Sequence, residues 1–565
     1  MKQDLEQIIA DVVKDLFAVD THVELTRPEE QFGDYATNVA LQLGQQVGKN
    51  PREIGETLAT KLRVAVAEQV SDISIAGPGF LNLKLHDSVL ASAAKSKPAR
   101  SLEGKVIVAE YSDPNPFKVL HAGHLYTSIV GDAIANLLES AGGTVHRVNF
   151  GGDVGLHVGK TMWAIFHEAP GHTMSEEDAW GNIQDMKHDS LHSRARWMAA
   201  RYTAGNDAYE DDAAAKQETV TLNKRVYQIH ADNDQQSLFA QIYWTCREWS
   251  YEYFKSFYAD IDIHEFERFY PESDTAPLGV KVVNEQLAKG VYEKSDGAIV
   301  FRGEPYGLHT RVFINSHGLP TYEAKDVGLS IKKWEDYSFD TSVIITGNDI
   351  VEYMKVVLKS IEQFAPELAN RTKHLTHGQV KLQGGVKMSS RKGNVLLADD
   401  ILEAANTAAK LLSGEASRTT SLAAVKYAFL KNRIGGDVIY EPEESVALEG
   451  NSGPYLQYAH ARARSVLAKA VMSASELSDL QPDERSLLRK ISEYPEVVEK
   501  AVGELMPHHI CTYLYELAQV FNRFYEHNRV IDDPRQIVRL QLVALYADKL
   551  NSGLTLLGIV APERM

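Results

Sequence analysis

The most informative segment of this chain is Lys105-Val-Ile-Val-Ala-Glu-Tyr-Ser-Asp-Pro-Asn-Pro-Phe-Lys-Val-Leu-His-Ala-Gly-His124. It opens with a short, mostly apolar and β-branched run, Lys105 to Tyr111, which predicts a buried strand. Two prolines then forbid regular structure, because proline fixes its own φ and biases the preceding residue away from the helical region. Apolar residues recur at helical spacing from Leu125 until a pair of glycines, and Thr144 to Phe150 predicts the next strand. Together these elements indicate a βαβ unit.

Two histidines stand at the predicted start of that helix. His121 and His124 are one helical turn apart, so both imidazoles can face the same ligand. The exposed N–H groups and the dipole of a helix N-terminus favour a phosphate there, which makes the pair candidate phosphate-binding residues. The other interpretation is that they are solvated or cap the helix, since any helix start can carry two histidines.

A second candidate motif, Lys387-Met-Ser-Ser-Arg-Lys-Gly-Asn394, follows a predicted strand and turn at Leu375 to Gly385. A basic loop rich in glycine and serine offers backbone donors, hydroxyls and ammonium groups to a polyphosphate. Alone, such a string also fits a solvated surface loop. Because it shares the chain with a histidine pair inside a βαβ unit, we favour a nucleotide site built from both.

Length and composition limit the class of protein. The 565 residues are too many for one core and predict roughly two to four domains. A content of 44% hydrophobic and 24% charged residues is typical of soluble globular proteins. Only Cys246 and Cys511 occur, so a disulfide framework and a cysteine-rich zinc site are excluded and we expect no structural zinc. With no secretion signal and no apolar run long enough for a bilayer, we expect a cytoplasmic protein without a membrane partner.

The net charge of −18 argues against a nonspecific nucleic-acid coat protein. It leaves room for a nucleic-acid partner that is recognised through local basic and aromatic patches. Because the motifs point to a nucleotide and the composition does not, we give the motifs more weight.

Changes in the predicted secondary structure along the sequence divide the chain into segments. Residues 1–100 combine predicted helices (5–16, 37–47, 54–66) with strands (73–76, 80–83), which indicates an α+β module. Residues 103–165 hold the βαβ unit, and residues 166–265 predict a helical insertion whose aromatic run, Trp244 to Phe254, we interpret as core rather than a nucleic-acid platform. Strands return in residues 266–400, at 298–301, 312–315 and 342–346. From about residue 410 strand signals vanish, and helices are predicted at 422–430, 454–471, 484–502, 510–527 and 536–550.

These motifs in this order resemble the class I aminoacyl-tRNA synthetases, and further strings narrow the resemblance to the arginyl-tRNA synthetases. The strings span nearly the whole chain: Gln31-Phe-Gly-Asp-Tyr-Ala-Thr-Asn38, Gly77-Pro-Gly-Phe-Leu-Asn82, Glu110-Tyr-Ser-Asp-Pro-Asn115, Asn149-Phe-Gly-Gly-Asp-Val-Gly155, Tyr322-Glu-Ala-Lys-Asp326, Gly453-Pro-Tyr-Leu-Gln-Tyr-Ala-His-Ala-Arg462, and Gly553-Leu-Thr-Leu-Leu-Gly-Ile559 with Pro562-Glu-Arg-Met565. The ordered set is far more specific than any one string.

The resemblance implies a multidomain α/β protein. Residues 103–410 would form a Rossmann-like, doubly wound parallel sheet with the helical insertion at about 166–265. Residues 1–100 would form an additional tRNA-contacting α+β module, and residues 411–565 an all-α anticodon-binding bundle. The implied activity is the two-step ligation of L-arginine to its cognate tRNA, with ATP as its Mg²⁺ complex, and we expect a monomer.

The resemblance also assigns roles to residues. The catalytic groups would be His121, His124, Lys387 and Lys118, and ATP would be bound by His121, Gly123, His124, Lys387, Met388, Ser389 and Ser390. Arginine would be bound by Glu110, Asn115, Tyr322 and Asp326; a planar carboxylate pairs bidentately with a guanidinium. Anticodon bases would contact aromatic and amide groups on the C-terminal helices: Tyr455, Tyr458, His460, Asn522 and Tyr525. No side chain is assigned to a metal. For the acids the alternative is a surface salt bridge, and for the C-terminal residues a place in the helical core.

One departure from the family pattern gives a further residue a role. The second signature is usually written KMSKS, yet Ser390 holds the position of its second lysine. Many arginyl enzymes share that lack and carry a lysine just before the first signature, where Lys118 stands. We therefore expect Lys118 to supply the missing charge, the alternative being a solvated lysine before a helix. A second departure is Asn348-Asp-Ile-Val-Glu352, where the glutamine that often helps to hold arginine is not evident.

Two other functions fit parts of the pattern. Another nucleotidyl transferase with the same histidine signature would usually be compact, which the N-terminal and C-terminal segments disfavour. A non-catalytic tRNA-binding relative would be expected to lack His121, His124 or Lys387, and all three are present.

Overall fold

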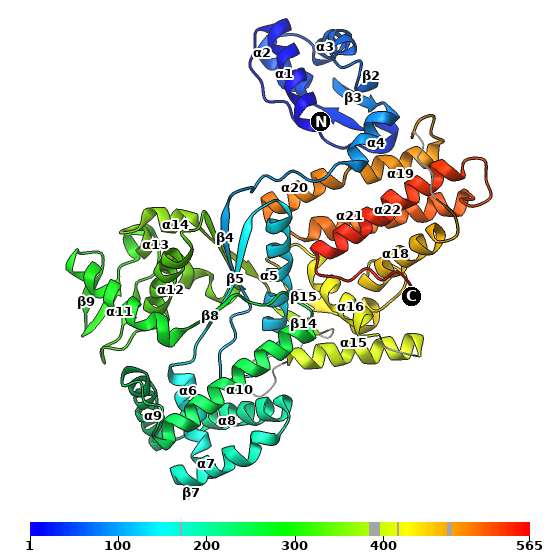
Figure 1. Cartoon of the computed structure of the whole chain (residues 1–565). Helices are drawn as coiled ribbons and strands as arrows, with labels where there is room; N and C mark the ends of the chain where they lie inside the picture. The colour runs from blue at the N-terminus through cyan, green and yellow to red at the C-terminus, as the bar shows by residue number, and fades with distance from the viewer. Residues whose placement is uncertain (170–171, 383–395, 415–416, 472–476) are drawn as a thin grey trace.

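A sheet of five parallel strands forms the centre of the molecule (Figure 1). The computed structural model describes residues 1–169, 172–382, 396–414, 417–471 and 477–565. The strand order is β13-β12-β4-β5-β8, with bounds β4 Val106–Glu110, β5 Thr144–Gly151, β8 Arg268–Pro271, β12 Thr341–Gly347 and β13 Thr372–His377. Because β5 lies on one side of β4 and β12 on the other, the strand order reverses at the carboxyl ends of β4 and β12. Open α/β sheets bind ligands at such a point.

Helices cover both faces of this sheet, as the alternation of side chains along β4 requires. Ile107 and Ala109 pack in one core with α5 (Ala122–Ser140). Val108 packs in a second core with residues of α11 (Glu272–Ala288), α12 (Tyr322–Tyr337) and α13 (Val351–Glu362). The predicted doubly wound parallel sheet is therefore confirmed. A small antiparallel sheet and one more helix complete this part: β9 Glu293–Ser295, β10 Ala298–Phe301, β11 Arg311–Ile314 and α14 Pro366–Arg371.

Helices fill the chain between β5 and β8, as predicted for the insertion. They are α6 Leu156–Ile165, α7 Glu176–Asp185, α8 Leu191–Asp211, α9 Ala213–Ala231 and α10 Leu238–Asp260, with the short strands β6 His167–Ala169 and β7 His172–Thr173 after α6. Trp249, Tyr253 and Phe254 on α10 are buried, so the interpretation of the aromatic run as core is confirmed.

A bundle of helices covers the side of α5 that faces away from the sheet (Figure 1). Its helices are α15 Ala398–Ser413, α16 Arg418–Leu430, α17 Pro442–Ser445, α18 Gly453–Leu467, α19 Pro482–Ser492, α20 Tyr494–Glu504, α21 His508–His527 and α22 Gln536–Leu556. Helix α5 is buried from Leu125 to Leu138 because it lies between the sheet and this bundle. In the described ranges, no helix combines the length and apolar character that a membrane span needs.

Two predictions for the C-terminal part are wrong. The single helix expected at 484–502 is two helices, α19 and α20, because Pro495 lacks the N–H group and has the ring that interrupt a helix interior. A strand does occur after residue 410: β15 (Val438–Tyr440) pairs in parallel with β14 (Val380–Leu382). Three residues are too few to show the alternation from which a strand is predicted, so β15 is defined by its partner.

The N-terminal module contains four helices and an antiparallel sheet of order β1-β3-β2, against which α2 and α3 pack. Its elements are α1 Lys2–Phe17, β1 Tyr35–Thr37, α2 Val39–Val47, α3 Pro51–Ala65, β2 Val70–Ala76, β3 Phe80–Leu85 and α4 Asp87–Lys95. The helix predicted from Thr37 begins at Val39 instead, because Thr37 pairs with Leu81 across the sheet.

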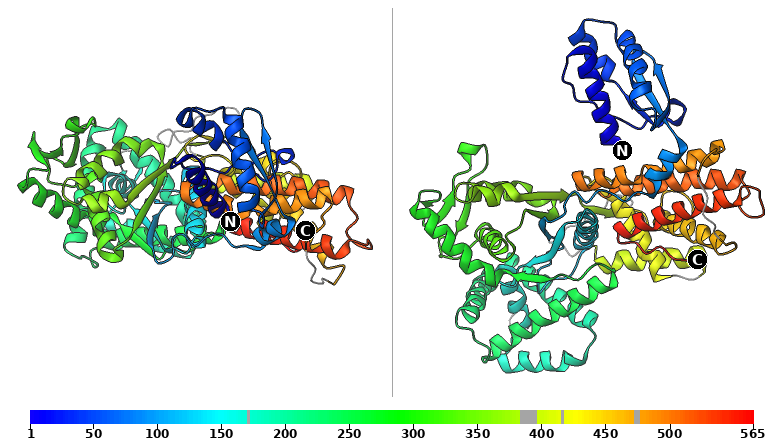
Figure 2. Two further views of the ribbon diagram at one scale, coloured as in Figure 1. Left: turned by 90° about the horizontal axis from the view of Figure 1, so that it is seen from above. Right: turned by 45° about the horizontal axis from the view of Figure 1, so that its top comes forward.

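This module docks on α19 and α20 of the bundle through ion pairs (Figure 2). Arg485 of α19 pairs with Asp34 at 2.7 Å and with Asp87 at 3.0 Å. Arg27 pairs with Glu496 of α20 at 2.5 Å. Asp34 is fully buried, and its charge is compensated by Arg485 and by Arg489 of the same helix, whose Nε atom lies 3.3 Å from the carboxylate.

We expect Arg485→Ala to destabilise the docked module by roughly 2 kcal/mol, because the buried Asp34 carboxylate loses its bidentate partner and is left with Arg489. The urea midpoint for unfolding of the N-terminal part should fall accordingly. Arg529→Ala is the matched control, since Arg529 and Asp532 form an exposed pair, and should change the midpoint little. Equal midpoints for the two variants would contradict the prediction.

Candidate active site

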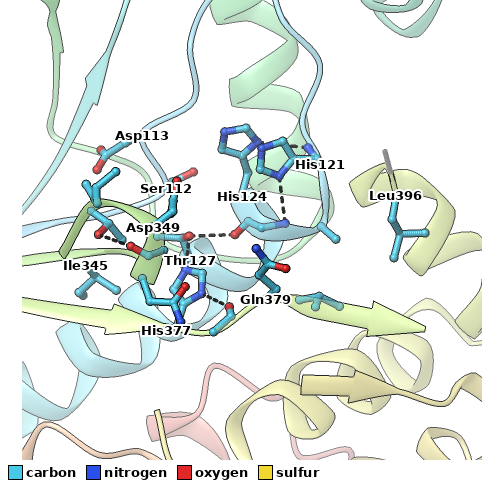
Figure 3. A pocket seen from close by; sticks show the side chains of 18 of the residues that line it. Ser112, Asp113, His121, His124, Thr127, Ile345, Asp349, His377, Gln379 and Leu396 are labelled. Carbon is cyan, nitrogen blue, oxygen red and sulfur yellow. Dashed lines mark hydrogen bonds between the residues drawn. The ribbon is translucent and has the colours of Figure 1, made fainter. Parts of the chain in front are cut away.

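The two signature histidines lie side by side where α5 begins (Figure 3). The Nδ1 atom of His121 accepts a hydrogen bond from the Gly123 N–H at 3.1 Å. The Nδ1 atom of His124 accepts one from the His121 N–H at 3.2 Å, and the two rings stack with centroids 3.8 Å apart. The pair does cap the helix, but only through Nδ1, which leaves both Nε2 atoms for other partners.

Both imidazoles are neutral at pH 7. Burial, with the nearby Lys118 charge, lowers the pKa of His121 to about 4. Burial and the neighbouring His121 lower the pKa of His124 well below its ordinary value. Because each Nδ1 accepts a hydrogen bond, the single proton of each neutral ring is on Nε2. The rings therefore offer two Nε2–H donors.

A cavity of about 510 Å³ opens beside the histidines, at the carboxyl ends of β4 and β12. Its wall includes Asp113 after β4, Asp349 after β12 and Gln379 after β13 (Figure 3). Asn115, also after β4, belongs to the same wall. This is the place that the reversal of strand order predicts for a ligand. The volume lies in the range of small-molecule and cofactor sites.

Several polar residues of this wall were not predicted from the sequence, among them Thr127, Asp349 and His377. The Thr127 hydroxyl lies 2.6 Å from Nε2 of His377. His377 ends β13 and Asp349 follows β12, so the rule that ligands bind at the carboxyl ends of parallel strands could have found both. Thr127 lies one turn inside α5 and carries no such signal.

Two buried acids near the cavity already have a lysine partner. Glu110, at the end of β4, forms an ion pair with Lys333 of α12, and both side chains are almost fully buried. Glu272, at the start of α11, pairs with Lys325 of α12 at 2.5 Å. Helix α12 therefore supplies a counter-charge to each of these carboxylates.

Two further acids have no such partner. Asp326 of α12 accepts a hydrogen bond from Tyr353, and burial together with the neighbouring Glu110 raises its pKa to about 8. Asp113 accepts the Phe150 N–H at 2.8 Å, and burial and Glu110 raise its pKa well above the ordinary value. Among the described residues, no lysine or arginine lies within ion-pair distance of either carboxylate.

The other residues expected to bind arginine differ in exposure. The Oδ1 atom of Asn115 accepts the Gly152 N–H at 2.8 Å, and Asn115 lines the cavity. Tyr322 is 55% exposed at the start of α12, with the Lys325 ammonium 5.1 Å from its ring centre. Of the four predicted residues, only Asn115 belongs to the wall of the 510 Å³ cavity; Glu110 and Asp326 are buried and are not part of that wall.

Lys118 lies between the histidines and the insertion. Its ammonium is 5.0 Å from the ring centre of Tyr202 on α8. Burial lowers the pKa of Lys118, and its charge acts on both His121 and His124. Among the described residues, no carboxylate is within ion-pair distance of this ammonium. Lys118 is half-buried and not a freely solvated lysine.

The residues predicted for the second signature, Lys387, Met388, Ser389 and Ser390, lie outside the described residues.

The residues expected to contact anticodon bases lie together on the bundle but differ in access. Tyr458 is 44% exposed, and Tyr455 accepts a hydrogen bond from Asn522 at 2.8 Å. The guanidinium of Arg462 lies 4.3 Å from the ring centre of Tyr525. His460 is buried, with Nδ1 2.9 Å from the Pro562 carbonyl oxygen.

Three family descriptions match consecutive parts of the chain. Residues 86–441 match the class I tRNA synthetases (R), catalytic domain, and residues 1–85 match the arginyl tRNA synthetase N-terminal domain. Residues 456–565 match the DALR anticodon binding domain. The catalytic match alone covers more than half of the chain.

Named relatives agree with these matches. The chain is 29% identical to an arginine–tRNA ligase of Flavobacterium psychrophilum, over 91% of this chain and 90% of that protein. It is also 29% identical to one from Lactobacillus delbrueckii subsp. bulgaricus, over the full length of both. The Thermus thermophilus arginyl-tRNA synthetase structure shares the fold, with a TM-score of 0.80 and 24% identity over all of both chains. The Plasmodium falciparum enzyme does so with a TM-score of 0.79 and 20% identity, over all of this chain and 99% of that one. The chain therefore belongs to the arginyl-tRNA synthetases, the class I enzymes that charge tRNA with arginine.

Proposed function

We propose that this protein ligates L-arginine to its cognate tRNA in two steps. The arginine carboxylate attacks the α-phosphate of ATP, bound as its Mg²⁺ complex, and pyrophosphate leaves. The acyl group of the adenylate then passes to the 2′-hydroxyl of the terminal adenosine of tRNA. The observation that carries this proposal is the neutral His121–His124 pair, which directs two Nε2–H donors to a cavity bordered by acids without a cation.

In the first step the protein positions the reactants and stabilises negative charge on the phosphates. His121 and His124 donate hydrogen bonds to phosphate oxygens. Gly123 is required beside the imidazole, because a side-chain carbon at this position would lie 2.9 Å from the His121 ring. In this proposal the glycine also lets the nucleotide approach closely. Lys118 adds an ammonium that no described carboxylate neutralises, which suits an anion. In this proposal Lys387, with Met388, Ser389 and Ser390, completes the phosphate site.

The proposed arginine site includes Glu110 at the end of β4 and Asp326 on α12. Asp326 takes the guanidinium, since a carboxylate matches its two parallel donors, and Tyr322 lies one turn away on the same helix. Asn115 binds the carboxyl end through its free amide nitrogen, because its Oδ1 already accepts the Gly152 N–H. Glu110, held by Lys333, borders the same end of the substrate.

The C-terminal helices recognise tRNA. Tyr455, Tyr458 and Tyr525 provide aromatic faces on which splayed bases stack, and Asn522 and His460 hold the surrounding surface through their hydrogen bonds. We further propose that residues 1–100, 103–410 and 411–565 act as three domains and that the enzyme works as a monomer in the cytoplasm.

Arginine-dependent exchange of pyrophosphate into ATP, measured with and without tRNA, tests this function. We expect exchange with arginine that lysine does not support at the same concentration. Exchange with another amino acid only would identify a different nucleotidyl transferase. Binding of tRNA without any exchange would identify a non-catalytic relative.

A further inference from the structure

A segment that is distant in the sequence braces the backbone of His121. Leu397 and His121 form an isolated antiparallel β-bridge. Two backbone hydrogen bonds join the residues on either side of that bridge: the Ala122 N–H to the Leu396 carbonyl oxygen at 2.8 Å, and the Ala398 N–H to the Leu120 carbonyl oxygen at 3.1 Å. His121 is therefore enclosed by bonds on both sides, and Leu396 itself lies in the wall of the 510 Å³ cavity. The direction of the His121 ring depends on where this bracing segment, residues 396–398, lies.

The bracing segment is joined directly to α15. Ala398 is both its last residue and the first residue of the helix. The Leu397 N–H donates to Oδ2 of Asp400 at 3.0 Å, which holds the segment against the first helical turn. A shift of this turn would therefore move the bracing segment, and with it the backbone of His121.

Two helices of the insertion hold that first turn through Asp399. Its Oδ2 atom lies 2.7 Å from Nε2 of His192 on α8 and accepts a hydrogen bond from the Tyr253 hydroxyl on α10 at 3.3 Å. The rings of His192 and Tyr253 meet edge to face with centroids 5.8 Å apart, so each partner supports the other. Tyr253 is 5% exposed, and its position is set by the core. Helices α8, α10 and α15 thus meet at one carboxylate.

The ordinary interpretation of Asp399 is an acid that interacts favourably with the dipole of its own helix. Asp399 and Asp400 both suit that role by position. Asp400 bonds within the start of its own helix, whereas the Asp399 carboxylate contacts two helices from another part of the chain. A purely local role does not need these contacts, so they indicate a connection between the insertion and α15.

We propose that Asp399 is a positioning residue that, held by His192 and Tyr253, fixes the first turn of α15 and thereby the direction of the His121 imidazole. Asp399 is not part of the described cavity wall and acts through the bracing segment. This inference rests on the proposed function, in which His121 donates to a phosphate oxygen of ATP. It adds that the insertion takes part in the first step by holding this donor in place.

Pyrophosphate exchange by the full-length enzyme with tRNA tests the proposal, because it separates effects on ATP from effects on arginine. We expect Asp399→Ala to lower kcat/KM for ATP roughly 10- to 100-fold, since a small displacement of a positioned donor weakens its contact with the phosphate. The KM for arginine should stay within about twofold, because the proposed arginine site does not include His121. Asp399→Asn keeps an oxygen that can accept the Tyr253 hydrogen bond and should remain within about threefold of the wild type.

The partner residue gives an independent readout. His192→Ala should lower kcat/KM for ATP, and adding it to Asp399→Ala should cause no further loss, because both changes break one contact. His192 is 51% exposed, so this variant tests the contact in a folded protein. Glu252→Ala is the matched control. Glu252 on α10 pairs with Arg194 of α8 at 3.3 Å and joins the same two helices to each other, so its loss should change kcat/KM for ATP by no more than about twofold.

Three results would overturn the positioning role: an unchanged kcat/KM for ATP in Asp399→Ala, a matching rise in the KM for arginine, or single effects that multiply in the double variant. Arginine-dependent exchange by the wild-type enzyme would still support the proposed function in each case. Absence of that exchange in the wild type would reject both.

Discussion

Replacing Lys118 by alanine should lower the rate of arginine activation by roughly 100- to 1000-fold, the usual effect of removing one preorganised electrostatic contact. The reason is the position of this ammonium beside His121 and His124, against the face of Tyr202. The Michaelis constant for arginine should change only a few-fold, because Lys118 acts on the phosphates. Pyrophosphate exchange at saturating and limiting arginine separates the two effects.

Two further variants define the role of Lys118. Lys118→Arg keeps the charge and should retain part of the activity, although a guanidinium is not equivalent to an ammonium. Lys281→Ala removes an exposed lysine of α11 and should leave activation within about twofold. An unchanged activation rate in Lys118→Ala would refute the idea that this residue replaces the missing signature lysine.

Replacing Asp326 by asparagine should raise the Michaelis constant for arginine roughly 100-fold, because the bidentate, charge-assisted contact with the guanidinium is lost. The Michaelis constant for ATP should change by no more than a few-fold from the wild-type value. Asparagine keeps an oxygen that can accept the Tyr353 hydrogen bond, so the fold of α12 is preserved. Asp336→Asn, on the same helix but bonded to Arg268, Tyr270 and Lys332, is the control and should not alter the arginine constant. Equal Michaelis constants for arginine in the wild type and in Asp326→Asn would exclude a role for Asp326 in binding the guanidinium.

The same carboxyl makes arginine binding pH-dependent. Burial and the nearby Glu110 and Glu272 raise the pKa of Asp326 to about 8, so below that pH most free enzyme carries a proton there. Because the guanidinium binds the ionised form, the Michaelis constant should fall about tenfold per pH unit from pH 6 toward 8 and then level off. In Asp326→Asn this dependence should disappear. The folded state holds this proton more tightly than the unfolded chain, so its contribution to stability is lost as pH rises from about 4 to 8.

Local patterns in the chain were sufficient for much of the fold and for the phosphate-binding end of the site. A β-branched run, two prolines and a helical repeat predicted the βαβ unit, and the helix start that carries His121 and His124 follows from them. The break at Pro495 could have been predicted in the same way, since proline acts within its own helix. The strand β15 could not, because its three residues become a strand only by pairing with β14.

The chemical groups that this protein brings to its reaction could be read from its residue order: the histidine pair, Lys118, and the acids of the segments around Glu110 and Asp326. Which acids lack a cation as a partner depends on how the chain folds. Glu110 meets Lys333 and Glu272 meets Lys325 across long separations in the chain, while Asp113 and Asp326 meet no described cation. The physical reason is that charge compensation and loss of water depend on distance and burial in space, and neither is encoded in the order of neighbouring residues.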